Sequence, residues 1–167
     1  NHQYSKSVEF ENDFRNYVND YISLDIQYFS FLRPINEVQI ASLFAKNKEY
    51  YKVFKSCNVG SKTDSWCGKC PKCLFTWIIM SPFIPENELI EIFGKNLLKN
   101  NDLVPIIRQL KGEVEVKPFE CVGTVEEVNA CLNYGQRKSG LENLLNQYDE
   151  ANNLPKHFEQ ILKDKLQ

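Results

Sequence analysis

Four of the six cysteines lie in one short run, and this run restricts the fold more than any other feature of the 167-residue chain. They are Cys57, Cys67, Cys70 and Cys73, with the spacing Cys-x9-Cys-x2-Cys-x2-Cys. Four thiolates are the complete ligand set of a closed tetrahedral zinc site. Gly68 supports this interpretation, because glycine lets the backbone turn so that Cys67 and Cys70 face one ion. A closed site leaves no coordination position for water or substrate, so the run predicts a structural role for the metal and indicates little about catalysis.

Three other interpretations of the run stay open. The cysteines could form two disulfides, although disulfide-rich chains are usually small, secreted and rich in turns. They could hold an iron–sulfur cluster, which also takes four cysteines with x2 spacings. A single Cys-x-x-C pair could be a redox site, but such a pair does not need four cysteines. Cys121 and Cys131 lie outside the run, and each also fits a small buried apolar side chain.

Charge and composition restrict the class of protein. The net charge is −2, with acidic and basic residues interspersed, so generic binding of nucleic acid is not indicated. The longest apolar run, Leu74 to Ile84, is too short to span a membrane and is typical of a buried helix. No secretory or membrane signal is evident, so we expect a reducing, cytoplasmic compartment. The first residue is Asn1 rather than Met, which indicates processing or an excised fragment.

The pattern of apolar residues predicts a mainly α chain with a few short strands. Strands are expected at 24–31, a buried run after the first helix, and at 113–117, an alternating edge segment. Capping residues, prolines and glycines set the predicted helix ends, notably the Thr124-x-x-Glu127 capping box and the stop at Gly94. Helices are expected at about 7–22, 35–45, 71–80, 86–93, 102–110, 124–134, 140–150 and 155–166.

Two further segments concentrate reactive side chains. The opening segment, Asn1 to Glu11, places Ser, Lys and Ser before a helix, which suits an anion or ordinary capping. The second segment places Glu120 beside Cys121 ahead of a helix N-terminus, where the dipole favours a thiolate that acts as base or nucleophile. A cysteine in a turn is the plainer alternative. The chain contains neither G-x-x-x-x-G-K-[ST] nor G-x-G-x-x-G.

The order of motifs resembles the C-terminal half of the zinc-bearing PP-loop ATP pyrophosphatases, which include the 7-cyano-7-deazaguanine synthases. A closer resemblance, over about residues 1–132, is to the UDP-N-acetylmuramoyl-L-alanyl-L-glutamate epimerases of bacterial cell-wall synthesis. The pieces that carry it are Asn1-His2-Gln3-Tyr4-Ser5-Lys6-Ser7 with Phe10-Glu11, Ser56-Cys57-Asn58, Trp66-Cys67-Gly68-Lys69-Cys70-Pro71-Lys72-Cys73 with Phe75, and Lys117-Pro118-Phe119-Glu120-Cys121-Val122-Gly123-Thr124.

The resemblance implies a fold and an activity. It implies the C-terminal part of a PP-loop α/β domain over residues 1–112, with the four-cysteine zinc knuckle, and a helical extension over 113–167. It implies an enzyme that cleaves ATP to AMP and pyrophosphate and inverts the terminal L-glutamate of UDP-MurNAc-L-Ala-L-Glu. The S-G-G-x-D-S phosphate loop is absent from this chain, so ATP and Mg²⁺ are expected in a missing N-terminal domain and the chain alone is expected to be inactive.

Site residues follow from this hypothesis. The cluster Cys57, Cys67, Cys70 and Cys73 is expected to hold zinc, and Glu120 and Cys121 are candidates for the catalytic step. His2, Gln3, Lys6 and Glu9 are expected to line the pocket for the UDP-muramoyl-dipeptide, with Lys6 placed for a phosphate or carboxylate. The alternative functions are a non-catalytic zinc module that binds protein or nucleic acid, and another enzyme related to the 7-cyano-7-deazaguanine synthases. No membrane partner is expected.

Overall fold

The computed structural model describes residues 4–118, 120–136 and 138–166. The chain divides into two compact units, which are described separately. Unit 1 comprises residues 1–36 and 147–167, and unit 2 comprises residues 37–146. The expected boundary at residue 112 falls inside unit 2, and it stays a prediction about how the longer enzyme is organised.

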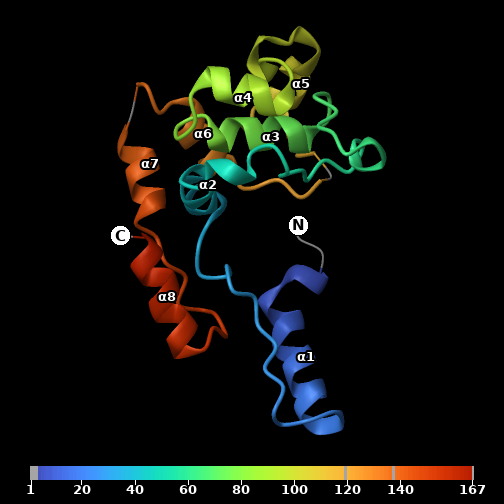
Figure 1. The fold of residues 1–167 in the computed structure, drawn as a ribbon, viewed down its shortest axis with the longest axis vertical. Coiled ribbons are helices and arrows are strands. Elements are labelled where there is room, and N and C mark those ends of the chain that lie inside the picture. Colours follow the sequence, from blue (N-terminus) through green and yellow to red (C-terminus); the bar gives the residue numbers. More distant parts are fainter. Residues whose placement is uncertain (1–3, 119, 137, 167) are drawn as a thin grey trace. The chain divides into compact units, whose positions relative to one another are not determined.

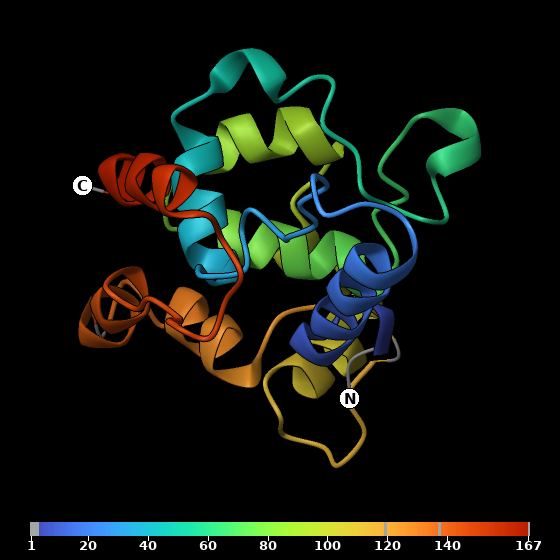
Figure 2. The same ribbon diagram turned by 90° about the horizontal axis from the view of Figure 1, so that it is seen from below.

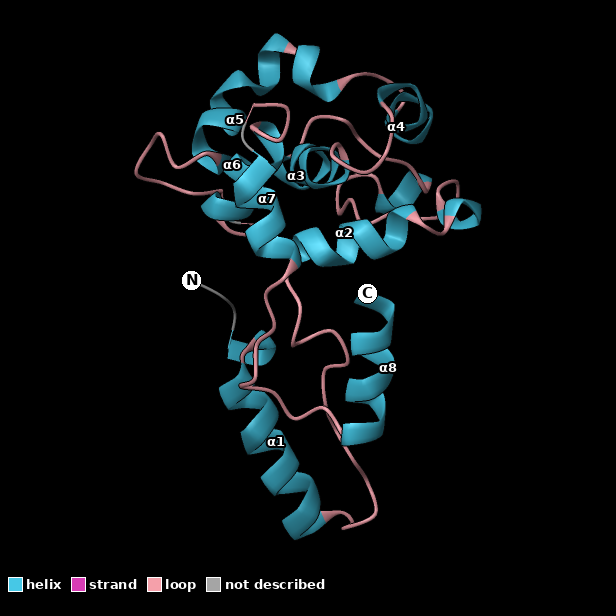
Figure 3. Ribbon diagram, turned by 90° about the vertical axis from the view of Figure 1, so that its left-hand side faces the viewer, coloured by secondary structure: helices cyan, strands magenta, loops and turns pink. Residues whose placement is uncertain are grey.

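Every regular element of the described residues is a helix, and none is a strand (Figure 3). Short 3₁₀ turns precede or connect some of the α-helices: Tyr4–Lys6 lies before α1, and Ser61–Thr63 lies between α2 and α3. No helix in the described part of the chain has the length and apolar character needed to cross a bilayer. The α-helices are α1 (Val8–Tyr21), α2 (Glu37–Ala45), α3 (Pro71–Met80), α4 (Glu86–Phe93), α5 (Val104–Leu110), α6 (Val125–Leu132), α7 (Lys138–Leu145) and α8 (Lys156–Leu166).

The predicted strands and the predicted PP-loop α/β domain were therefore wrong. In the segment 24–31, polar groups of the backbone bind side chains of α1 instead of a neighbouring strand. The Tyr28 carbonyl accepts a hydrogen bond from Arg15 (2.7 Å), and the Ser30 N–H donates to the Glu11 carboxylate (3.0 Å). The segment 113–117 is an exposed irregular loop after α5. Without a second strand to pair with, an alternating apolar pattern does not form a sheet.

Unit 2 is built around α3. The residues from Cys73 to Met80 are all buried, because this helix is apolar on nearly every side. Helices α2, α4, α5 and α6 pack against it, and α7 packs against α2 and α6 (Figures 1 and 2). The predicted end of α4 is confirmed: Gly94 closes it in the left-handed conformation (φ 80°).

Unit 1 contains α1 and α8, and the segment between residues 22 and 36 runs between them. Ser7 caps α1 as predicted, since its hydroxyl accepts the Phe10 N–H at 3.1 Å. On the other side of the segment, the rings of Phe29 and Phe31 pack on Phe158 of α8, with centroids 5.4 and 5.8 Å apart. Unit 1 therefore has a small aromatic cluster, in which Phe31 remains 38% exposed.

Candidate metal centre and candidate catalytic turn

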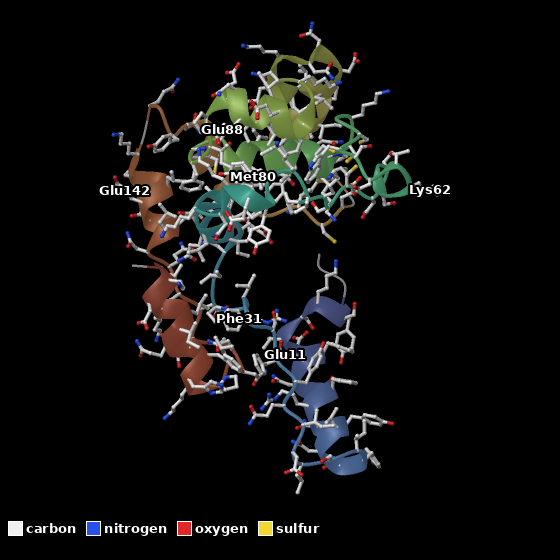
Figure 4. All side chains as sticks on the ribbon, viewed as in Figure 1. Glu11, Phe31, Lys62, Met80, Glu88 and Glu142 are labelled. Atoms are coloured by element: carbon white, nitrogen blue, oxygen red, sulfur yellow. The ribbon has the colours of Figure 1, made fainter. Side chains whose placement is uncertain are left out.

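The four cysteines of the run come together in unit 2. Their Sγ atoms all lie within 4.8 Å of one another. Cys57 precedes the loop that carries Lys62, which extends from the cluster (Figure 4), and Cys67 precedes the turn at Gly68. Cys70 is the N-cap of α3, and Cys73 lies in its first turn. The N-terminus of the most buried helix is thereby joined to a long polar loop.

The spacing of the sulfur atoms fits one tetrahedral ion. Zinc–thiolate bonds of about 2.3 Å place the sulfurs about 3.8 Å apart along each edge of the tetrahedron. Three of the six Sγ–Sγ distances are 3.8 Å (Cys57–Cys70), 3.7 Å (Cys67–Cys73) and 3.5 Å (Cys70–Cys73), and all six are within 4.8 Å. A disulfide requires about 2.05 Å, and none of the six cysteines is in a disulfide. The donor set and its geometry therefore fit a single thiophilic cation.

Backbone N–H groups point at the cluster and stabilise thiolates. Gly60 donates to Cys57 Sγ at 3.2 Å, and Cys73 N–H donates to Cys70 Sγ at 3.4 Å. Burial opposes ionisation of Cys57, but the N–H groups of Cys67 and Gly60 outweigh it and lower the pKa of Cys57 to about 7. Burial raises the pKa of Cys70 to about 11. Four neighbouring sulfurs, three of them on buried cysteines, cannot all ionise without a cation between them.

The cluster is closed to substrate. Cys57, Cys70 and Cys73 are buried, and Cys67 is half-buried. Trp66 is also buried, packs on Phe54 and Phe93 (centroids 5.3 and 4.7 Å), and donates its indole N–H to the Phe54 carbonyl. Gly68 takes φ 63°, which confirms the predicted turn. A metal held here by four thiolates has a structural role.

The second predicted site, Glu120-Cys121, lies in a tight turn between α5 and α6. Cys121 is exposed, whereas Glu120 is half-buried and its Oε2 atom is buried without a hydrogen-bond partner. Lys117 Nζ donates to the carbonyls of Val122 and Gly123 and so closes the turn. The structure therefore presents a thiol at the surface beside a carboxylate that lacks one partner.

Close packing joins this turn to α3. A Cβ atom at Gly123 would lie 2.6 Å from the Phe75 ring and 2.5 Å from the Glu127 carboxylate, so only glycine fits. Phe75 belongs to the helix that contains Cys73 and is capped by Cys70. Helix α3 therefore contacts both candidate sites. The turn that contains Glu120 and Cys121 packs against it, and the cysteine cluster lies at its N-terminus.

Glu127 has a second role that sequence reasoning missed. Its carboxylate forms the predicted capping box with Thr124, and it also accepts the Glu37 N–H at the start of α2 (2.8 Å). The side chain is almost fully buried, with 3% exposed. One carboxylate therefore caps two helices. The capping-box pattern identified the residue, but nothing local in the sequence indicates its bond to α2.

The predicted substrate residues lie in unit 1, and only some of them are described. His2 and Gln3 fall outside the described residues. Lys6 is exposed in the 3₁₀ turn before α1, and its carbonyl accepts a bond from Arg33 at 3.1 Å. Glu9 is exposed in the first turn of α1. Their assignment to substrate stays a prediction.

A buried ion pair behind this opening segment was not predicted. Glu11 is 2% exposed and pairs with Arg33 at 3.2 Å; it also accepts the Ser30 N–H and, at 2.9 Å, the Asn153 side-chain amide. Figure 4 shows Glu11 on the side of α1 towards Phe31. Arg33 also donates hydrogen bonds to the carbonyl oxygens of Lys6 and Ser7. The sequence did contain one signal for the burial of Glu11. Glu11 lies seven residues before the apolar Val18, so the two side chains share one face of α1.

Unit 2 also has an open groove of about 720 Å³ beside Trp66. Positive and negative side chains line it in equal number, and Lys48 is already paired with Glu88 at 2.8 Å. A strongly anionic group would meet both signs of charge, so the groove lacks the selectivity of a phosphate site. Its residues are Lys48, Glu49, Tyr51, Lys52, Lys55, Trp66, Glu88, Glu91 and Ile92.

Comparison with known proteins finds the same family that the order of the sequence motifs resembles. The family model described as the MurL C-terminal domain matches residues 53–159, which include the cysteine cluster and the Glu120-Cys121 turn. The model described as the MurL N-terminal domain matches residues 1–31. No solved structure matches the chain.

Curated relatives share the same name, UDP-N-acetyl-alpha-D-muramoyl-L-alanyl-L-glutamate epimerase. The protein from Micromonospora sp. is 44% identical over 131 residues, which is 76% of this chain and 29% of the relative. The Xanthomonas oryzae protein is 41% identical over 138 residues, covering 79% of this chain and 31% of the relative. The Salinispora tropica protein is 40% identical over 144 residues, covering 84% and 32%.

The chain therefore spans about a third of the length of these relatives. The match to the C-terminal domain model spans more than half of the chain, and it contains both the closed thiolate centre and the turn that rests on the same helix. On this ground the chain belongs to the MurL C-terminal domain family.

Proposed function

We propose that this chain is the C-terminal part of an enzyme that inverts the terminal L-glutamate of UDP-MurNAc-L-Ala-L-Glu. The observation that carries the proposal is the 40–44% identity to three epimerases across the cysteine cluster and the Glu120-Cys121 turn. ATP and Mg²⁺ would bind in a part of the enzyme outside this chain. A reducing, cytoplasmic compartment would suit its free thiols.

The chemistry explains why such an enzyme needs ATP. A proton beside a carboxylate is very hard to remove. Attack of the glutamate carboxylate on ATP would release pyrophosphate and form an acyl-adenylate, whose electron withdrawal makes the α-proton removable by a positioned base. The proton returns on the opposite face, and water then cleaves the anhydride to release AMP.

Cys121 and Glu120 are the proposed proton carriers in this chain. The exposed thiol could meet a substrate held by the rest of the enzyme, and the partly buried Glu120 carboxylate has a free oxygen beside it. Proton transfer on two faces of one carbon calls for two groups or one group that moves. Lys6 and Glu9, with His2 and Gln3, are proposed to contact the polar part of the UDP-muramoyl-dipeptide.

We further propose that Cys57, Cys67, Cys70 and Cys73 hold a structural zinc ion. The Sγ–Sγ distances of 3.5–3.8 Å support it, because an iron–sulfur cluster would place several irons and sulfides between the thiolates and separate them further. Elemental analysis should find one zinc per chain. A coloured, iron-containing protein would contradict the assignment.

The test of the activity uses a fusion of the preceding part of the Xanthomonas oryzae relative to this chain. The fusion should convert the L-glutamyl substrate to the D-glutamyl product in the presence of ATP, and it should incorporate solvent deuterium at the α-carbon. Cys121→Ala should lose at least about 100-fold in deuterium incorporation, since acid–base groups contribute about 10²–10⁴-fold. Exchange of pyrophosphate into ATP should continue, because adenylation does not need this thiol.

Two controls sharpen the result. Cys131→Ala removes a buried thiol of α6 outside the turn and should leave deuterium incorporation nearly unchanged. Glu120→Gln should lower proton transfer while retaining the fold. If the Cys121→Ala fusion epimerises at the full rate, the thiol is not a proton carrier. A fusion that binds zinc but never consumes ATP would favour the alternative of a non-catalytic zinc module.

A further inference from the structure

One face of α1 carries a continuous row of aromatic rings, here called the aromatic stripe: Phe10, Phe14, Tyr17 and Tyr21. Neighbouring ring centroids along the row are 5.8, 6.5 and 5.1 Å apart. The spacing i, i+4, i+7, i+11 keeps the four rings on one side of the helix. Tyr4 extends the row at one end (5.6 Å from Phe10), and Tyr28 packs beside it (4.7 Å from Phe14).

The stripe is not the face that α1 buries within unit 1. The buried residues of α1 are Glu11 and Val18, which lie roughly a quarter turn away from the stripe at 100° per residue. By contrast, 53% of Tyr17 and 75% of Tyr21 are exposed. The chain after α1 adds further exposed apolar side chains, Ile22, Leu24 and Ile26.

Such a surface is unusual on a free protein. Contiguous exposed apolar patches mark sites where another surface binds. The tyrosines suit an interface in particular, because they combine a large apolar ring with a hydroxyl group that can stay hydrated. The stripe therefore calls for an identified partner.

The match to a second family model indicates where a partner would come from. The MurL N-terminal domain model matches residues 1–31, a range that contains the whole stripe and the apolar residues after it. The curated relatives are about three times as long as the segment that they share with this chain. Among the described residues of unit 1, few apolar side chains are buried, among them Val18, Ile35, Leu154 and Leu162. So small a core suits a segment that completes a larger domain.

We infer that the aromatic stripe packs on the remainder of a MurL N-terminal domain. Glu9, Asp13 and Asp20 lie along the edge of the stripe away from the buried face, so the surface that receives it carries basic side chains beside an apolar groove. This interface rests on the family assignment and on the stripe, and it does not depend on the epimerase chemistry or on the metal.

Nitration of tyrosines by tetranitromethane, read by mass spectrometry, tests the inference. Two proteins are compared: the chain alone, and the fusion to the preceding part of the Xanthomonas oryzae relative. In the chain alone, Tyr17 and Tyr21 should react readily. In the fusion, their nitration should slow by about tenfold or more, because a packed ring reacts only during local opening. Tyr50, which is 54% exposed in unit 2, is the internal reference and should react equally in both proteins.

A matched pair of variants tests the energy of the contact in the fusion. Tyr17→Ala with Tyr21→Ala should lower the thermal midpoint of the fusion by several degrees, because the two substitutions remove large rings from the proposed interface. Asn16→Ala with Asn19→Ala changes exposed residues on the far side of the same helix and should leave the midpoint unchanged or slightly raised.

Three outcomes would overturn the inference. In the first, Tyr17 and Tyr21 react as fast as Tyr50 in the fusion. In the second, they are protected in the chain alone, and a dependence on protein concentration would then identify a second copy as the partner. In the third, the stripe is protected only by lipid vesicles. An inactive fusion with protected tyrosines would defeat the proposed activity but not this interface, and an active fusion with reactive tyrosines would do the reverse.

Discussion

At the scale of single residues, the six cysteines have three different environments. Cys121 is exposed, four cysteines form the proposed metal centre, and Cys131 is buried in α6. Burial raises the pKa of the Cys131 thiol to about 12, so it stays protonated and unreactive at neutral pH. Reactivity towards thiol reagents should therefore separate the three groups.

We expect the six cysteine thiols to become reactive towards a thiol reagent in three steps. In the zinc-loaded native protein, one thiol should react with a disulfide reagent such as 5,5′-dithiobis(2-nitrobenzoic acid). A strong chelator should release four more, and only a denaturant should release the sixth. A native, metal-loaded protein with five reactive thiols would contradict the proposed ligand set. Cys121→Ser should remove only the first step.

Glu11 offers a second prediction at this scale. Glu11→Ala leaves Arg33, the Ser30 N–H and the Asn153 amide without their shared acceptor. Breaking one side of a buried pair should destabilise unit 1 by about 3 kcal/mol. Amide hydrogen exchange in α1 and α8 measures it. Glu9→Ala on the same helix is the control, and loss of this exposed acid should cost no more than about 1 kcal/mol. Equal effects of the two changes would show that Glu11 has no special role.

At the scale of elements, local signals identified most helices. Ser7, the Thr124–Glu127 capping box and Gly94 lie where the sequence placed helix ends, because capping depends only on neighbouring residues. The predicted strand at 24–31 was wrong for the opposite reason. Its backbone bonds go to Arg15 and Glu11, and a pattern of apolar residues contains no information about such distant partners.

The turn before α6 gives a prediction for an element. Gly123→Ala would force a Cβ atom against Phe75 and Glu127, so either the turn or α3 must shift. We expect a loss of about 2 kcal/mol in the stability of unit 2, and a larger fall in the activity of the fusion than Cys131→Ala causes. Tryptophan fluorescence during urea unfolding measures the stability.

Gly140→Ala is the matched control for this change. Gly140 lies within α7, and a Cβ there would make an ordinary 3.8 Å contact with Ala130. The substitution should stabilise unit 2 by up to about 1 kcal/mol, since alanine is the better helix former. If both glycines tolerate alanine equally, the turn is not held against α3.

At the scale of the whole molecule, the metal should stabilise one unit only. Both tryptophans, Trp66 and Trp77, lie in unit 2, close to the cluster or on α3. Chelation should shift their emission to longer wavelength and lower the unfolding midpoint of unit 2, because binding energy at a structural site is folding energy. Zinc, but not magnesium, should restore the original spectrum.

Hydrogen exchange distinguishes the two units in the same experiment. Amides of α3 should lose protection on chelation, whereas amides of α1 and α8 should keep theirs, since the contacts of Glu11, Arg33 and Phe158 do not involve the cysteines. Uniform loss of protection across the chain would contradict a local role for the metal.

The sequence alone indicated the cysteine cluster, several helix ends and the family, because spacing, capping and motif order are properties of residues close together in the chain. Only the tertiary structure placed four sulfurs within 4.8 Å of one another, joined Glu127 to the start of α2, and set Gly123 against Phe75. It also left residues 24–31 without a strand and two rings of the aromatic stripe, Tyr17 and Tyr21, exposed. These features depend on contacts between residues that are far apart in the sequence. In unit 2 those contacts come from packing around α3, and in unit 1 they include the hydrogen bonds of Glu11.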